Sequence, residues 1–151
     1  MNAKTQSLLS RLTLSDAGAG ALALRVPVGV ILMAHGAQKL FGWFGGYGLE
    51  ATGQWMASIG FNPGLVMALL AGSAEFFGGI ALILGVLTRP AAVVAAFTMA
   101  MAMTVHLGNG LFISNNGYEF ALSLLAATVA LAFIGGGSFS VDQRINRAVT
   151  V

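Results

Sequence analysis

Four long runs of apolar residues limit the fold of this chain more than any other feature. A helix needs about 20 mostly apolar residues to cross the hydrocarbon core of a bilayer. Each run is continuous and lacks the polar–apolar alternation of a barrel strand. We therefore predict an all-α integral membrane protein, a four-transmembrane-helix bundle whose spans cover about 20–42, 65–87, 90–107 and 118–136.

The composition agrees with a membrane protein. Of the 151 residues, 57% are hydrophobic and 8% are charged, whereas soluble domains carry roughly 25% charged residues. The sequence has no basic patch interleaved with aromatic residues, so nucleic acid is not an expected partner. The chain has no cysteine, which excludes thiolate catalysis and iron–sulfur clusters held by this chain alone.

The spans divide the chain into an N-terminal segment (1–19), a transmembrane domain (20–137) and a tail (138–151). A basic start before an apolar run also suggests a signal peptide. Arg25 interrupts that run, so we expect the first span to be retained. The tail is predicted to form a short amphipathic helix on the membrane surface, with an apolar stripe opposite two arginines: Val141, Ile145 and Val149 against Arg144 and Arg147.

The basic residues predict how the chain crosses the membrane, because cytoplasmic loops carry an excess of Lys and Arg. Lys39 is the only basic residue on one side of the predicted bundle. The other side holds Lys4, Arg11, Arg89, Arg144 and Arg147. We therefore expect a bacterial inner-membrane protein with both termini in the cytoplasm. The connections 43–62 and 108–117 would face the periplasm, the first as a glycine-rich loop that holds both tryptophans.

Residues typical of helix ends flank the spans. Asn62, which precedes a proline, is expected to cap the second span. Asn116 and Glu119 have the spacing of a capping box at the start of the fourth span. Ser140 and Gln143 have the same spacing at the start of the tail helix.

Polar and ionisable side chains within the spans are the strongest functional signal, since a charge in the bilayer core costs at least about 2.5 kcal/mol and often marks a site. Residues three and four positions apart lie on one face of a helix, and the first span places three polar residues in this way. Each of the other three spans contributes one ionisable residue, in the half of the bilayer away from the termini. We predict a polar pocket there, lined by His35, Gln38, Lys39, Glu75, His106 and Glu119.

Glu75 is the deepest of these residues, near the middle of the second span. It shares a face with Gly72 and Gly79, and small residues let another helix approach closely. We expect Glu75 to bond His35 or Lys39 at the floor of the pocket. The alternative is a protonated glutamate that only joins two helices.

Other polar residues have simpler interpretations. Lys39 is long enough to reach the surface, and Glu119 suits a capping role. Arg25 and Arg89 lie toward the cytoplasmic side, in structural roles or, for Arg25, in contact with lipid phosphates. No metal site is expected. A row of Met99, Met103 and His106 would suit Cu(I), although methionine is also a common core residue.

Several motifs, taken together in order and spacing, resemble the DoxX family of small bacterial four-helix membrane proteins. The resemblance covers about 25 to 145. It rests on Arg25 with Gly29, H-G-x-x-K (35–39), E-x-x-G-G-x-x-L-x-x-G (75–85), T-R-P-A-A (88–92), His106, and G-x-G-x-x-S-x-D (135–142). It implies that the recurrent polar positions are Arg25, His35, Lys39, Glu75 and His106. It also implies a link to quinone-dependent or thiol-redox assemblies.

Three functions follow as hypotheses. The first is a redox-associated membrane subunit whose pocket binds a quinone headgroup, with oxidoreductase subunits as partners, since the chain has no self-contained catalytic motif. The second is a structural or assembly subunit, and the third a transporter of a small solute or protons. A row of small residues, expected on an exposed face of the third span, would also permit a homo-oligomer. These residues are Ala91, Ala92, Ala95 and Ala96.

Overall fold

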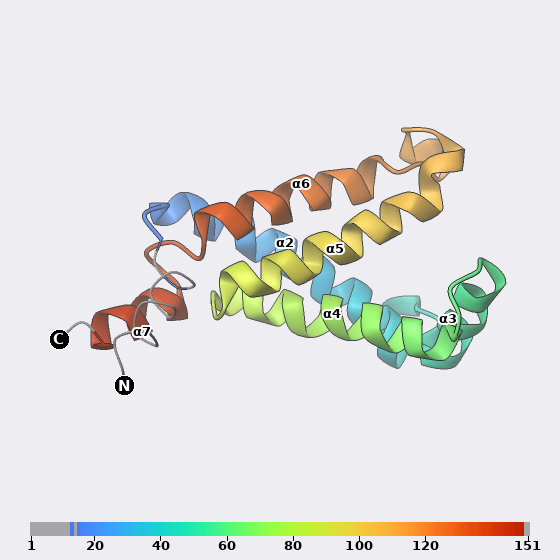
Figure 1. The fold of residues 1–151 in the computed structure, drawn as a ribbon, viewed down its shortest axis with the longest axis horizontal. Coiled ribbons are helices and arrows are strands. Elements are labelled where there is room, and N and C mark those ends of the chain that lie inside the picture. Colours follow the sequence, from blue (N-terminus) through green and yellow to red (C-terminus); the bar gives the residue numbers. More distant parts are fainter. Residues whose placement is uncertain (1–12, 14, 150–151) are drawn as a thin grey trace.

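The computed structural model describes residue 13 and residues 15–149, and this part of the chain contains helices and turns but no strand. Lys4, Arg11 and the side chain of Val149 lie outside the described residues. Four long helices make the body of the molecule (Figure 1). They are α2 (Gly18–Phe41), α4 (Gly64–Leu84), α5 (Thr88–His106) and α6 (Glu119–Ile134).

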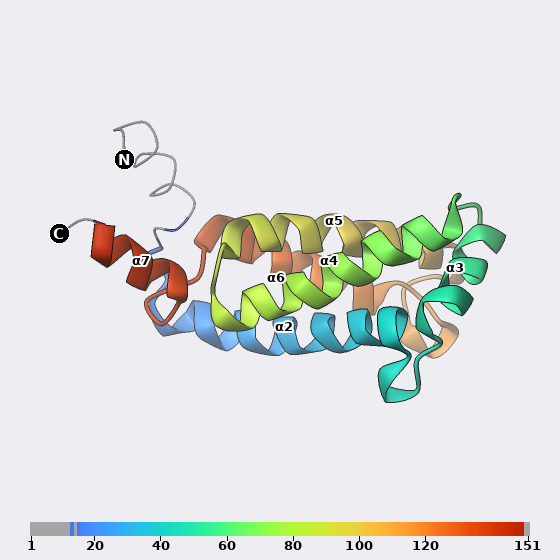
Figure 2. The same cartoon turned by 90° about the horizontal axis from the view of Figure 1, so that it is seen from below.

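Short helices connect and extend these four. Helix α3 (Gly48–Ser58) precedes α4, and α7 (Val141–Val149) follows α6. Single helical turns lie at Trp43–Gly45 (η1), Leu107–Asn109 (η2) and Ile113–Asn115 (η3). Figures 1 and 2 show α7 projecting beyond the end of the bundle where α2 begins.

Three stretches are long and apolar enough to cross a membrane: Gly18–Phe41, Gly64–Leu84 and Thr88–Asn109. Helix α6 is apolar but has only 16 residues, about 24 Å of helix against a hydrocarbon core of about 30 Å. The structure thus supports the all-helical prediction, with three long candidate spans and one shorter apolar helix.

The core lies where all four long helices meet. Helices α2 and α4 form one closely packed pair and α5 and α6 the other, as both ribbon views show. The buried core side chains are Val28, Leu32, Leu82, Ala92, Ala95, Met99, Leu124 and Leu131. Ala92 and Ala95 were expected on an outer face of the bundle, and that expectation is wrong, because both are fully buried inside the chain's own core.

The expected glycine-rich loop at 43–62 is largely helical. Gly53 of α3 and Gly64 of α4 pack backbone against backbone, since a Cβ added to Gly64 would lie 2.1 Å from the Gly53 carbonyl oxygen. The glycines therefore serve close helix packing in α3 and do not leave the segment irregular.

Two of the three predicted caps are wrong. Pro63 occupies the N-cap position of α4, without a side-chain hydrogen bond, so Asn62 lies one residue too early. Asn116 adopts a left-handed conformation (φ 59°) after η3, and the Glu119 carboxylate accepts the Ile113 N–H at 2.6 Å. The cap of α7 is confirmed, because Ser140 Oγ accepts the Gln143 N–H at 3.1 Å.

The face of α7 that is buried against the rest of the chain is polar. Asp142 and Asn146 are buried there, and Asn146 bonds Thr13. Val141 and Ile145, the described members of the predicted apolar stripe, are 37% and 39% exposed. The tail helix is therefore held by polar contacts and presents its apolar residues outward.

Candidate functional site

Backbone contact between α2 and α4 builds the site. A Cβ added to Gly36 would lie 2.4 Å from the Phe76 nitrogen, and one added to Gly79 would lie 2.5 Å from the Met33 nitrogen. Real Cβ atoms essentially never approach so closely, so only glycine fits at both positions. The expectation that Gly79 admits a neighbouring helix is therefore confirmed, and the turn of α2 after Gly36 lies directly beside α4.

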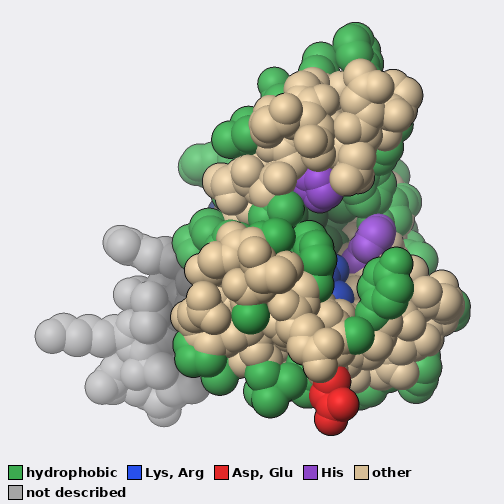
Figure 3. Space-filling model, turned by 90° about the vertical axis from the view of Figure 1, so that its right-hand side faces the viewer, with side chains coloured by type: hydrophobic (Ala, Val, Ile, Leu, Met, Phe, Trp, Pro, Cys, Tyr) green, Lys and Arg blue, Asp and Glu red, His purple; other side chains and the backbone are tan. Residues whose placement is uncertain are grey.

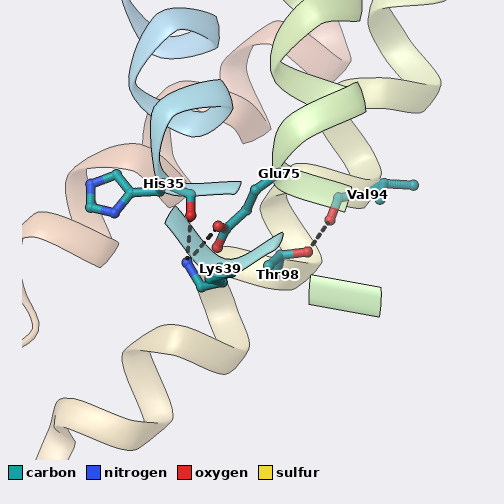
Figure 4. A network of polar contacts seen from close by, with 5 residues as sticks. All are labelled: His35, Lys39, Glu75, Val94 and Thr98. Carbon is teal, nitrogen blue, oxygen red and sulfur yellow. Dashed lines mark hydrogen bonds and ion pairs between the residues drawn. The ribbon is translucent and has the colours of Figure 1, made fainter. Parts of the chain in front are cut away.

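Lys39 and Glu75 form an ion pair across this contact. Lys39 Nζ lies 2.5 Å from Glu75 Oε2 and also donates to the His35 carbonyl oxygen at 3.4 Å (Figure 4). The Glu75 side chain is 3% exposed and the Lys39 side chain 24%. The expected reach between Glu75 and Lys39 is confirmed, and the lysine is the partner that remains accessible.

His35 lies one turn before Lys39 and has no hydrogen bond to its imidazole among the described residues. Its ring is half-buried and lies 5.6 Å from the ring of Phe120 on α6. Both ring nitrogens are therefore available to another molecule, which distinguishes His35 from the paired residues beside it.

Thr98 of α5 completes the surroundings of the pair, and sequence reasoning missed it. Figure 4 shows its side chain beside Lys39 and Glu75. Its hydroxyl donates to the Val94 carbonyl oxygen at 3.1 Å, within its own helix. A threonine in an apolar helix is common, so only its place on α5 opposite the ion pair gives it significance.

A recess leads toward these residues from the end of the bundle opposite α7. Figure 3 views that end and shows histidine and basic side chains between an upper part, which is the 107–118 connection, and a lower part with α3. A separate shallow groove of about 300 Å³ lies between α3 and the start of α4, lined by Glu50, Gly53, Gln54, Ala57, Gly64 and Leu65. It does not contain the ion pair.

The other three predicted pocket residues form hydrogen bonds to the segments that connect the helices. Gln38 Nε2 donates to the Phe44 carbonyl oxygen at 3.4 Å. His106 Nδ1 lies 3.0 Å from the Asn116 carbonyl oxygen, and Glu119 accepts the Ile113 N–H. The six predicted residues therefore separate into a central group of three and a peripheral group in which each side chain has one polar atom bonded to a connecting segment.

The alternative of a copper row has little support from the geometry. Met99 is 5% exposed and belongs to the apolar core, while His106 bonds the 107–118 connection.

Arg25 and Arg89 have structural contacts at the opposite end. Arg25 is 1% exposed and donates to carbonyl oxygens of Leu82 (2.8 Å), Gly136 (3.1 Å), Phe139 (2.9 Å) and Ile83. This burial does not fit the expected contact with lipid phosphates. Arg89 donates to the carbonyl oxygens of Ala132 (3.0 Å) and Phe133 at the end of α6.

Asp142, which lies at the same end as Arg25 and Arg89, is the second residue to which the sequence analysis gave no role. Its carboxylate accepts the N–H groups of Leu87 at 2.7 Å and Thr88 at 2.9 Å, at the start of α5. A carboxylate at a helix N-terminus satisfies unbonded N–H groups and favours the helix dipole. Its position in the motif G-x-G-x-x-S-x-D was the one available signal.

A protein-family model matches more than half of the chain. Residues 20–107 match the DoxX family. The chain belongs to the DoxX family. The matched region contains the α2–α4 contact and the Lys39–Glu75 pair.

Three curated relatives are similar over most of their length. "Inner membrane protein YqjF" of Escherichia coli (strain K12) is 29% identical over 85% of this chain and 93% of its own. "Putative oxidoreductase CatD" of Bacillus subtilis (strain 168) is 32% identical over 82% and 84%. "Inner membrane protein YphA" of E. coli is 30% identical over 82% and 88%. No solved structure matches the chain.

Proposed function

We propose that this DoxX family protein is a multi-pass protein of a bacterial inner membrane in which α6 is the fourth span. Two similar proteins carry the name inner membrane protein, and α6 packs against α5. Four spans place both termini on one side, and the positive-inside rule favours the cytoplasm. The part 20–137 is then the membrane domain, with 1–19 and 138–151 inside the cell.

We further propose that the protein is a redox-associated membrane subunit whose recess binds the headgroup of a quinone. The observation that carries this proposal is the accessible Lys39, held by buried Glu75 beside the unbonded imidazole of His35. A quinone headgroup is planar and has carbonyl oxygens that accept hydrogen bonds. Lys39 and His35 supply donors for them, and the Phe120 ring supplies an apolar wall.

The redox step needs a partner. Reduction of a quinone takes up two electrons and two protons. This chain contributes the binding site and the hydrogen-bond donors, Lys39 and His35, and Glu75 or Glu119 passes the protons, which are taken up from water. The electrons come from a partner oxidoreductase subunit, since the chain has no cysteine and no self-contained catalytic motif. The name of the B. subtilis relative is consistent with such an assembly.

The proposal is tested by equilibrium binding of a water-soluble short-chain ubiquinone to the purified, reconstituted protein. Saturable binding is expected. In Glu75→Gln it should weaken by about tenfold or more, because hydrogen bonds to charged groups contribute about 1.5–3 kcal/mol and Lys39 loses its partner. Glu50→Gln is the matched control, since Glu50 is an exposed carboxylate on α3, which lies at the same end of the molecule (Figure 1). Absence of binding to the wild-type protein would overturn the proposal.

A structural role for the pair is the second candidate function. The observation that favours it is the ion pair itself, which joins α2 to α4 at 2.5 Å. If Lys39→Met and Glu75→Gln both lower the thermal stability and the wild-type protein binds no quinone, the pair serves packing alone.

A transport pathway has less support. Arg25 and Lys39 lie 14 residues apart on α2, about 21 Å of helix, and buried apolar residues Val28 and Leu32 lie between them. Proteoliposome flux is the measurement that decides this third hypothesis, and no flux of protons or small anions is expected.

A further inference from the structure

The chain between α2 and α3 forms an exposed aromatic turn, residues 42–48. Trp43, Phe44 and Tyr47 are 54%, 70% and 86% exposed. No charged residue lies between Lys39 and Glu50. Figure 2 shows the turn projecting sideways from the bundle beyond α2, away from the other long helices. Water is a poor environment for such a surface.

The depth of the turn follows from the helix that it leaves. Leu40 packs against Gly72, whose added Cβ would lie 2.8 Å from the Leu40 side chain. The ring centroids of Phe41 and Phe76 lie 5.2 Å apart. Gly72 lies eight residues after the first residue of α4, about 12 Å along the helix. Because α4 is long and apolar enough to span the membrane, the turn emerges beside its interior and not beyond its end.

The backbone of the turn is held in place while its rings point outward. A Cβ added to Gly46 would lie 2.5 Å from the backbone of Gln38, and the Gln38 amide bonds the Phe44 carbonyl oxygen. Phe44 adopts φ 55°, a left-handed conformation that costs roughly 1–2 kcal/mol for residues other than glycine. Such strain persists only where the surrounding structure fixes it.

We propose that the aromatic turn is embedded in the lipid leaflet at the end of the bundle opposite α7. Its contact with lipid then holds the last turn of α2 at a fixed depth. Tryptophan and tyrosine favour the boundary between hydrocarbon and headgroups. A turn that leaves α2 on the hydrocarbon side of that boundary brings the rings of Trp43, Phe44 and Tyr47 within reach of it from inside the leaflet. The turn rests on Gln38, next to Lys39. Lipid contact thereby fixes the depth at which Lys39 meets Glu75.

The two tryptophans allow a direct test in the full-length protein. Trp43 lies in the turn, and Trp55 lies on α3, whose Gly53 packs against the start of α4. Trp55→Phe and Trp43→Phe each leave one tryptophan. Both variants are reconstituted in phosphatidylcholine vesicles whose acyl chains carry bromine at either a shallow or a deep position, and circular dichroism confirms that they fold alike.

Two results are expected. Trp43 should emit at short wavelength, lose most of its emission to brominated lipid and resist quenching by aqueous iodide. Trp43 should also be quenched best at a deeper bromine position than Trp55, because its turn leaves α2 about 12 Å inside the start of α4.

Either of two other results would overturn the proposal. Quenching of Trp43 by iodide without quenching by brominated lipid would place the turn in water. Short-wavelength emission that neither quencher affects would place it against protein, such as a second copy of the chain.

Discussion

The two ends of α2 use basic residues in opposite ways. Arg25 is 1% exposed, and its guanidinium donates to four carbonyl oxygens that belong to α4 and to the segment before α7. Lys39 is 24% exposed, has one carboxylate partner and lies beside the His35 imidazole, with which no described residue forms a hydrogen bond. A basic group whose donors are all used holds helices together, whereas a partly exposed one beside unbonded polar atoms is able to bind a further molecule.

The largest effect on stability is expected at the Arg25 end of α2. Arg25→Met removes the donors of four carbonyl groups, and each buried acceptor left unbonded costs about 1–3 kcal/mol. We expect a loss of at least about 3 kcal/mol, seen as little folded protein in membranes and a strongly lowered melting temperature in detergent.

Arg144→Met is the control for Arg25, because Arg144 is exposed on α7. It should leave the melting temperature nearly unchanged. If Arg25→Met were equally mild, the contrast between the two ends of α2 would be lost.

A smaller effect is expected where the two helices touch. Gly36→Ala places a Cβ 2.4 Å from the Phe76 nitrogen, so α2 and α4 must separate, at a cost of about 1–3 kcal/mol for overpacking. The separation also draws Lys39 away from Glu75. Quinone binding should therefore weaken together with thermal stability.

Gly20→Ala provides the matched control on the same helix, since a Cβ there meets no atom within 4 Å. It should be neutral or slightly stabilising, because alanine favours helix more than glycine does. Equal behaviour of the two variants would contradict the close packing at Gly36.

Asp142 allows a further test at the end of the bundle that contains Arg25. Asp142→Ala leaves the N–H groups of Leu87 and Thr88 without their acceptor, and the loss of a helix N-cap typically costs about 0.5–2 kcal/mol. Thermal unfolding should report a moderate destabilisation with quinone binding unchanged. Asp16→Ala, at an exposed carboxylate near the same end, should show neither effect, and a loss of binding in Asp142→Ala would show that the two ends are coupled.

The sequence predicted the Lys39 end of α2 better than the Arg25 end for a physical reason. Lys39 and Glu75 face each other because helical spacing fixes the face of each side chain, and glycines at the spacing of Gly72 and Gly79 indicate a neighbouring helix. Both kinds of information are present in a single sequence. The reach of Glu75 to Lys39 was therefore predictable, although the engagement of Gln38, His106 and Glu119 by the connections was not.

Arg25 and Asp142 were out of reach of the same reasoning. The acceptors of Arg25 are backbone carbonyl groups 57 to 114 residues away, and Asp142 caps a helix 54 residues earlier in the chain. Backbone groups leave no trace in a side-chain pattern, so only the tertiary fold reveals these contacts. The helical α3 was missed because glycines typical of a loop serve close helix packing there.

The smallest effect on stability, and the sharpest test of the contrast, is expected at His35. Because no described residue bonds its imidazole, His35→Ala should change the free energy of unfolding by no more than about 0.5 kcal/mol. Quinone binding should weaken by about threefold to tenfold, since a neutral hydrogen bond contributes about 0.5–1.5 kcal/mol. Thermal unfolding and quinone titration of one preparation give both numbers, and Phe120→Leu is the control that keeps the neighbouring wall apolar. A His35→Ala protein that melts as early as Arg25→Met would make His35 a structural residue, and the Lys39 end of α2 would then differ from the Arg25 end only in its exposure.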